Sequence, residues 1–238
     1  MKRLRWILGV VASLALIFAL LITSFEVAVY SDFDWYQKEY EKYNVTNDLT
    51  MKLDDVMDVT HEMMAYLRGN REDLVVYTTI GGVENQEFFN DQDKTHMADV
   101  QKLFLGGLKL RLIALGLLVL CLGVMIVTKV DLKRLLPRCY QLGLGFAAIG
   151  TLAVGIYAAL DFNTFFTKFH EVFFTNDLWI FDPRSDYMIR MLPEGFFADM
   201  AFRIGMMFVI SLLIVLIISI IYDKIYRKKK ITISEVRG

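Results

Sequence analysis

The three histidines of this sequence, His61, His96 and His170, are the side chains best suited to proton transfer. An imidazole titrates near pH 6.5, so it can accept or donate a proton at ambient pH. A lone histidine is most often an ordinary surface or half-buried polar residue. His96 and His170, however, each lie beside a long apolar run, which indicates a matching depth at a membrane boundary. Two histidines at the depth of lipid ester carbonyls can perform acid/base chemistry on an ester.

A metal site is an alternative use of the same residues. His96 and Asp99 are three residues apart on one helix face, and Glu171 adjoins His170. Both carboxylates are equally well explained as solvated surface groups. The chain has no GxSxG, HExxH or phosphate-loop motif, and its two cysteines form no CxxC pair and suit small apolar fillers. We therefore predict neither a metal nor another cofactor, and no nucleic-acid partner.

The segment Lys168–Phe197 is too polar for a bilayer core and too aromatic for an ordinary loop. A helix overlapping its start carries phenylalanines on one face, namely Phe162, Phe165, Phe166, Phe169 and Phe173. Such a helix lies in the membrane interface with its apolar side toward the acyl chains. We predict that Phe162, Phe166, Phe169 and Phe173 contact acyl chains at the outer lipid–water boundary.

Long apolar runs show why these elements lie at a membrane. The chain is 55% hydrophobic with a mean hydropathy of +0.43, and four runs carry no charged residue: Trp6–Phe25, Leu112–Thr128, Cys139–Leu160 and Ile204–Tyr222. A bilayer core of about 30 Å needs roughly 17–25 apolar helical residues. The first run exceeds the core of a typical signal peptide and lacks a clean cleavage site after it, so we interpret it as an uncleaved span. The predicted spans are about 6–25, 108–128, 139–160 and 204–222.

The charges between the runs predict the orientation of the spans. The segments before span one, between spans two and three, and after span four hold 13 basic and 3 acidic residues. Segment 26–102 holds 7 basic and 17 acidic residues, and segment 161–203 holds 4 and 7. Lysine and arginine collect on the cytoplasmic side of membrane proteins. Both termini are therefore predicted to be cytoplasmic, and the two long segments extracytoplasmic.

The outward segments have their own pattern of secondary structure. Apolar residues at helical spacing predict an amphipathic helix over about 50–68, and the β-branched stretch 74–80 suits a short strand or a hairpin through Gly81 and Gly82. A helix capped by Asp91 or Asp93 should begin near Lys94 and continue into span two. Asp182–Pro183 predicts a turn, and Pro193 the start of another short helix. The predicted fold is an all-α membrane protein, one integral domain over 1–238, with four spans and a small extracytoplasmic cap.

Two pieces of the sequence, HMADV at residues 96–100 and FHEVFFTNDLWIFDPRSDYMIRMLPEGFF at 169–197, resemble the bacterial lipoprotein intramolecular transacylase family. The resemblance also covers the four spans with both termini inside. It implies an enzyme that moves an acyl chain of a diacylated lipoprotein onto that lipoprotein's own N-terminal cysteine, giving the lyso-form. His96 and His170 match the two catalytic histidines of the family, whereas His61 matches no catalytic position.

A mechanism follows from the two imidazoles. One histidine would free the α-amine of the substrate, and the other would protonate the departing glyceryl oxygen or donate to the tetrahedral oxyanion. The sequence leaves open which histidine takes which role. Asp99 can orient His96 or form a simple surface pair, and Asn176 is a candidate oxyanion donor. The expected partners are the diacylated lipoprotein and membrane lipids, at the outer leaflet of a bacterial cell membrane.

Two other classes of function remain open from the sequence. A non-enzymatic membrane protein could bind lipids or lipoproteins through the aromatic stripe, and its histidines would then be replaceable. A small permease is the third class. The spans carry few polar groups besides Gln141 and Thr151, whereas transport routes generally need more intramembrane polar residues.

Overall fold

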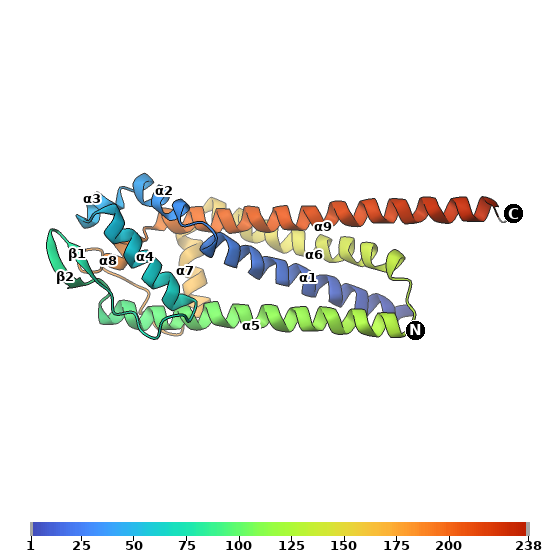
Figure 1. Cartoon of the computed structure of the whole chain (residues 1–238), viewed down its shortest axis with the longest axis horizontal. Coiled ribbons are helices and arrows are strands. Elements are labelled where there is room, and N and C mark those ends of the chain that lie inside the picture. The colour runs from blue at the N-terminus through green and yellow to red at the C-terminus, as the bar shows by residue number, and fades with distance from the viewer. Residues whose placement is uncertain (1, 237–238) are drawn as a thin grey trace. The chain divides into compact units, whose positions relative to one another are not determined.

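The computed structural model describes the backbone of residues 2–236 and the side chains of residues 3–225. Figure 1 shows the course of the chain through its helices and strands. In chain order these are α1 Lys2–Tyr30, α2 Asp34–Lys42, α3 Val45–Leu49, α4 Leu53–Leu67, β1 Tyr77–Ile80, β2 Val83–Glu87, α5 Asp91–Val127, α6 Leu132–Leu160, α7 Phe162–Phe173, α8 Tyr187–Met191 and α9 Glu194–Val236.

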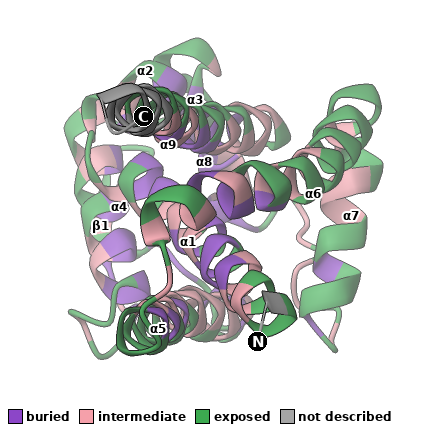
Figure 2. Ribbon diagram, turned by 90° about the vertical axis from the view of Figure 1, so that its right-hand side faces the viewer, coloured by how far each residue is buried: buried purple, intermediate pink, exposed green. Residues whose placement is uncertain are grey.

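Four of these helices, α1, α5, α6 and α9, are long and apolar enough to cross a membrane. Their outward faces are apolar, as α6 illustrates with Phe146, Ile149 and Leu152, all more than 60% exposed. Figure 2 shows exposed residues along most of α6. A continuous apolar surface of this kind is stable against lipid and not against water, and helices satisfy their own backbone hydrogen bonds there. The predicted four-span, all-α membrane protein is confirmed.

Helix α5 is longer than a bilayer requires. Its 37 residues extend about 55 Å at 1.5 Å per residue, against a hydrocarbon core of about 30 Å. The uncharged run begins at Leu112 and the predicted span near residue 108, so the turns from Asp91 to about Gly107 precede the predicted span. The prediction that one helix continues without a break into span two is confirmed.

The residues form two compact units by their internal contacts. The first comprises the chain up to Phe25, the segment Lys109–Ile156 and the chain from Ile204 onward. Within it, α1 packs against α6 and α9 around Ile17, Tyr140, Phe208 and Leu212, and the Tyr140 hydroxyl donates to the Leu212 carbonyl at 2.8 Å. Close approach is possible because residue 9 is a glycine, where a Cβ would lie 2.5 Å from the Cys139 sulfur.

The second unit comprises Glu26–Leu108 and Tyr157–Arg203. The amphipathic helix predicted over 50–68 is α4, and its buried face packs against α2. Tyr40 and Thr60 are both fully buried there, with their hydroxyl oxygens 2.7 Å apart. Phe196, in the first turn of α9, stacks on the Tyr40 ring at 6.0 Å between centroids. An aromatic core therefore fastens the start of α9 to α2 and α4.

The predicted hairpin is present as β1 and β2, which pair antiparallel. Gly81 and Gly82 both have positive φ angles, 60° and 78°, which are required in the tight turn between Ile80 and Val83. A hydrogen bond from the Gly81 amide to the Thr50 carbonyl, 3.0 Å long, ties the turn to the segment before α4.

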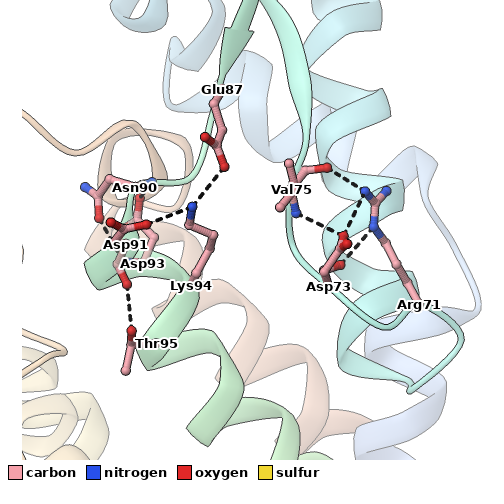
Figure 3. A network of polar contacts seen from close by, with 9 residues as sticks. All are labelled: Arg71, Asp73, Val75, Glu87, Asn90, Asp91, Asp93, Lys94 and Thr95. Atoms are coloured by element: carbon pink, nitrogen blue, oxygen red, sulfur yellow. Dashed lines mark hydrogen bonds and ion pairs between the residues drawn. The ribbon is translucent and has the colours of Figure 1, made fainter.

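The start of α5 corrects one detail of the prediction. The helix begins at Asp91 and not near Lys94, and Asn90 caps it. The Asp93 amide donates to Asn90 Oδ1 at 2.9 Å, and the Asn90 amide donates to Asp93 Oδ2 at 3.0 Å, a reciprocal capping pair. Asp93 thus supports the cap from inside the helix. Figure 3 shows this pair together with Lys94, which bridges Glu87 of β2 and Asp91.

Two further boundaries differ from the sequence-based expectation. The helix that begins after Pro193 is not short, because α9 runs from Glu194 directly into span four. Helix α6 begins at Leu132 and contains Pro137 in its second turn, where we expected a connecting segment up to Arg138. Because proline has no amide hydrogen, the Lys133 carbonyl lacks the intrahelical bond that another residue at position 137 would donate. The turn predicted at Asp182–Pro183 is confirmed by amide bonds from Ser185 and Asp186 to the Asp182 carbonyl.

The capping pair generates the first prediction. Replacing Asn90 by alanine removes the acceptor of the Asp93 amide and should lower the stability by about 1 kcal/mol. The variant Asn90→Ala should therefore unfold several degrees below wild type in a thermal scan in detergent. The control is Asn70→Ala, at an exposed position after α4. We expect this substitution to lower the folding stability by less than about half a kcal/mol. Equal unfolding temperatures for the two variants would contradict a role of Asn90 as the cap.

Candidate active site

His96 lies in the second turn of α5, in the part of the helix that precedes the predicted span. Only 5% of its surface is exposed. Its Nδ1 atom is buried and has no hydrogen-bond partner among the described residues. A buried polar atom without a partner is costly in a folded protein. This nitrogen is therefore suited to bind a group that is supplied from outside the chain.

His170 lies near the end of α7, whose bounds agree with the predicted aromatic helix. Asp161 caps the helix by accepting a hydrogen bond of 3.0 Å from the Thr164 amide. The His170 ring is buried, and its Nδ1 lies 2.7 Å from the Phe166 carbonyl oxygen, one turn earlier. A carbonyl oxygen can only accept, so Nδ1 must carry the proton. In the neutral ring the lone pair then belongs to Nε2, which makes Nε2 the basic atom.

The two rings lie side by side although 74 residues separate them in sequence. Their centroids are 6.0 Å apart and their planes differ by 27°. One substrate group can therefore reach both imidazoles.

An aromatic enclosure surrounds the pair. Phe174 contacts both rings, with centroid distances of 5.1 Å to His96 and 5.4 Å to His170. Phe181 lies 5.4 Å from the His96 ring, and Trp179 lies 4.9 Å from the His170 ring. These apolar walls remove water from the imidazoles and leave them in a medium of low polarity.

Desolvation sets the charge state of the two histidines. Burial lowers the pKa of His96 to about 4, helped by the neighbouring His170 and opposed by the Asp99 carboxylate. Burial also lowers the pKa of His170, and the hydrogen bond to Phe166 partly opposes this. Both rings are therefore neutral at pH 7. Each can accept a proton at one nitrogen, or donate a hydrogen bond from the other, without first losing a proton.

The aromatic walls come from the segment 174–186, and polar side chains of α5 hold this segment in place. Gln92 Nε2 donates to the carbonyl oxygens of Leu178 and Ile180 at 3.1 and 2.9 Å. The side-chain Nδ2 of Asn176 donates to Asp99 Oδ2 at 3.0 Å, and the side-chain Nδ2 of Asn90 donates to Asp186 Oδ1. The N-cap and the first and third turns of α5 thus fix a loop that would otherwise have few partners.

Asp99 and Asn176, the two supporting residues predicted from the sequence, are joined to each other. A hydrogen bond of 3.0 Å from Lys102, together with the one from Asn176, keeps the pKa of Asp99 below its usual value. The Asn176 Oδ1 atom accepts from the Leu178 amide at 3.1 Å. In this arrangement both residues position the loop beside the histidines. The role of Asn176 as an oxyanion donor and that of Asp99 in orienting His96 stay predictions.

The phenylalanine face of α7 divides into two parts. Phe166 packs on the His170 ring at 4.3 Å and on Phe197 of α9 at 4.9 Å, and Phe162 stacks on Phe166 at 5.8 Å. Phe169 and Phe173 are exposed, with ring centroids 4.7 Å apart. The exposed pair is available to an acyl chain, whereas Phe166 supports the histidine.

The sequence-based analysis did not single out Gln92, Phe174 or Phe181 as site residues. Gln92 precedes His96 by one helical turn, which was a usable signal for a shared face. The places of Phe174 and Phe181 depend on the path of an irregular loop, for which the sequence offers no periodic signal. His61 is exposed on α4 and stacks on Phe33 at 4.2 Å, so it takes no part in the pair of rings. Within the part of the chain that the structure describes, no group of three or more metal-ligating side chains comes together.

Comparisons with known proteins point to one family. The sequence profile of the family described as "Lipoprotein intramolecular transacylase Lit" matches residues 10–197, a stretch that contains both buried histidines. A comparison with curated protein sequences finds no match. Among solved structures, the membrane integral lipoprotein intramolecular transacylase Lit from Bacillus cereus superimposes with a TM-score of 0.73 at 21% identity, covering 98% of this chain and all of that chain.

Two further structures of the Bacillus cereus protein carry a substituted histidine. The form with histidine replaced by arginine has a TM-score of 0.76 at 19% identity and covers 96% of both chains. The form with histidine replaced by alanine has a TM-score of 0.71 at 21% identity and covers 97% of both. At this identity the likeness shows a common fold.

The burial of the two rings generates the second prediction. In the unliganded protein, His96 should remain neutral at pH 5.5, and His170 should be protonated less than a histidine of ordinary pKa. Nitrogen NMR of protein labelled in its histidines should also show His170 protonated at Nδ1. Folding stability should fall as pH decreases from about 6.5 toward 4, because the unfolded state binds more protons than the folded one. A His96 titration midpoint near 6.5 would contradict the enclosure.

Proposed function

Because this chain belongs to the lipoprotein intramolecular transacylase family, we propose that it moves one ester-linked acyl chain of an S-diacylglyceryl cysteine to the α-amine of that cysteine. The product is a lyso-form lipoprotein with an amide-linked chain. The observation that carries the proposal is the pair of buried, neutral imidazoles with ring centroids 6.0 Å apart. An acyl transfer from ester to amine needs one base and one donor at a single point, and the pair can provide both.

His170 is the base in this proposal. Its Nδ1–H donates to the Phe166 carbonyl, so Nε2 offers its lone pair to the substrate. As the amine nitrogen forms a bond to the ester carbonyl carbon, Nε2 takes the proton that the nitrogen loses. The same imidazolium then gives this proton to the glyceryl oxygen as the carbon–oxygen bond breaks. The proton balance closes on one residue, as in acyl transfer by other histidine bases.

His96 is the hydrogen-bond donor. Its pKa of about 4 keeps the ring neutral, and a neutral imidazole can donate one N–H bond to the oxyanion that develops on the carbonyl oxygen. The buried Nδ1 atom without a partner is available for this contact. The Phe174 ring, which contacts both imidazoles, keeps water from the same space and so strengthens the bond.

No nucleophilic serine or cysteine is needed, because the substrate amine attacks directly. Donor and acceptor belong to one molecule, so the enzyme's task is to fold them together. Bringing reacting groups to about 3–3.5 Å can supply a large part of a catalytic effect. The exposed rings of Phe169 and Phe173 are placed to hold an acyl chain near His170.

The distribution of charge supports an active site at the outer leaflet. The basic residues gather at the ends of the spans away from the histidines, and the segments that carry the histidines are acidic. A lipoprotein anchored in the outer leaflet of a bacterial cell membrane would enter with its acyl chains in lipid and its peptide outside. Both termini of the enzyme would then be cytoplasmic.

The third prediction separates the roles of the two histidines. His170→Ala and His170→Gln should both abolish the lyso-form product, because neither side chain is a base. His96→Ala should lower the rate by roughly 10²–10³-fold, whereas His96→Gln, which keeps an N–H donor, should retain part of the activity. Mass spectrometry of lipoprotein N-termini measures the product, and His61→Ala is the matched control. Full product from both alanine variants would favour the binding-protein alternative.

The fourth prediction concerns orientation. A membrane-impermeant maleimide on intact cells should label Glu84→Cys, at an exposed position of β2, and not Lys129→Cys. The native cysteines are both buried and need not be removed. Labelling of Lys129→Cys alone would place the histidines on the cytoplasmic side and remove the outer-leaflet site.

A further inference from the structure

A second feature of the first unit has no part in the proposed reaction. A partly open cavity of about 510 Å³ is lined by residues from α1, α5, α6 and α9. Its walls are mainly aliphatic, with Ala12, Leu16, Leu118, Leu122, Leu136 and Ile218 among them. A volume in the range of roughly 300–1,000 Å³ is typical of pockets that hold small molecules.

The polar groups in the wall are already bonded to the protein. The Ser13 hydroxyl donates to the Gly9 carbonyl at 2.8 Å, and the Ser219 hydroxyl lies 3.3 Å from the Pro137 carbonyl. The Tyr140 hydroxyl donates to the Leu212 carbonyl at 2.8 Å. With these donors occupied, the interior has little to offer a polar ligand. A hydrocarbon chain fits it better, because it loses no hydrogen bonds on entry.

The position of the cavity along the helices matches one leaflet of a bilayer. Lys133 and Tyr222, both exposed, line it at the charged end of the spans. Leu118 precedes Lys129 by eleven residues, and Leu16 follows Arg5 by eleven, which is about 16 Å along a helix in each case. About half of a 30 Å hydrocarbon core therefore lies between the charged end and the deepest lining residues. One acyl chain of a lipid in the leaflet at this end has a comparable length.

The charged end has an excess of positive charge. Lys129, Lys133, Arg134 and Arg138 lie within ten residues, together with one acid, Asp131. Tyr222 on the other side of the cavity is followed by Asp223 and Lys224. A lysine at the rim of an apolar cavity keeps its ammonium group at the headgroup level and its stem along the apolar wall. A basic rim of this kind attracts anionic lipid headgroups.

We propose that this cavity binds one acyl chain of an anionic glycerophospholipid from the leaflet at the basic end, with the lipid phosphate near Lys133. In this proposal the occupant is a structural lipid, and neither histidine is among the residues that line the cavity. The inference does not depend on the transacylation mechanism or on the direction in which the protein is inserted.

Native mass spectrometry of the full-length protein tests the proposal. Protein in mild detergent is equilibrated with equal amounts of phosphatidylglycerol and phosphatidylethanolamine, and the retained lipids are counted. We expect one retained lipid, with phosphatidylglycerol preferred about fivefold, the ratio that one lysine at an anionic surface provides. Lys133→Glu should abolish the preference. Lys129→Glu, the matched control at a position outside the cavity lining, should reduce the preference much less.

Filling the cavity tests the acyl-chain part separately. Ala12→Phe and Leu122→Phe, on two different helices, should each reduce retention of both lipids several-fold, and thermal unfolding identifies the variant that remains folded. Equal retention of the two lipids by wild type, equal effects of the two lysine variants, or undiminished retention in a folded cavity-filled variant would overturn the proposal. Retention of a free fatty acid in place of a phospholipid would overturn it as well.

Discussion

The attachment of segment 174–186 to the first turns of α5 is the constraint on which the candidate site depends. Gln92 donates hydrogen bonds to two backbone carbonyls of this loop, and Asp99 accepts one from the side chain of Asn176. The loop in turn supplies the aromatic walls around both histidines. Without these bonds the loop would have little regular backbone structure to fix it. The bonding side chains lie on the N-terminal turns of α5, where the regular helix spaces them along the loop.

The same walls explain how an acid/base pair can work beside a membrane. An imidazole in water changes charge near neutral pH, whereas an enclosed one remains neutral and keeps its tautomer. The Phe166 carbonyl selects the tautomer of His170, and burial lowers the pKa of His96. In the proposed reaction, these surroundings would give two chemically identical side chains different roles. The difference arises from one backbone hydrogen bond and from the unequal surroundings of the rings.

The spans themselves have a separate requirement, which is to pack closely while most of their surface faces lipid. Helix α1 meets α6 where Gly9 lies against Cys139, since any larger residue at position 9 would collide with the sulfur. Small residues bring transmembrane helices together because dispersion contacts replace the hydrophobic effect there. The cavity lies close to this contact, with Ala12 and Pro137 in its wall, and its aliphatic lining follows from the same composition that makes the helices insert.

By itself the sequence determined the features that depend on local composition and period. The four spans, the amphipathic helix α4, the hairpin turn at Gly81 and Gly82, and the aromatic helix α7 all follow from length, spacing and turn chemistry, and the choice of His96 and His170 came from a motif with a known family. Only the tertiary structure decided that the two rings stack, that Asn176 bonds to Asp99, and that Phe174 contacts both imidazoles. Except for the contact of Phe174 with His170, these contacts join residues 74 to 78 positions apart, and Phe174 and Asn176 lie on a loop without periodicity. Their geometry depends on many weak long-range interactions acting together, and no local pattern in the chain records it.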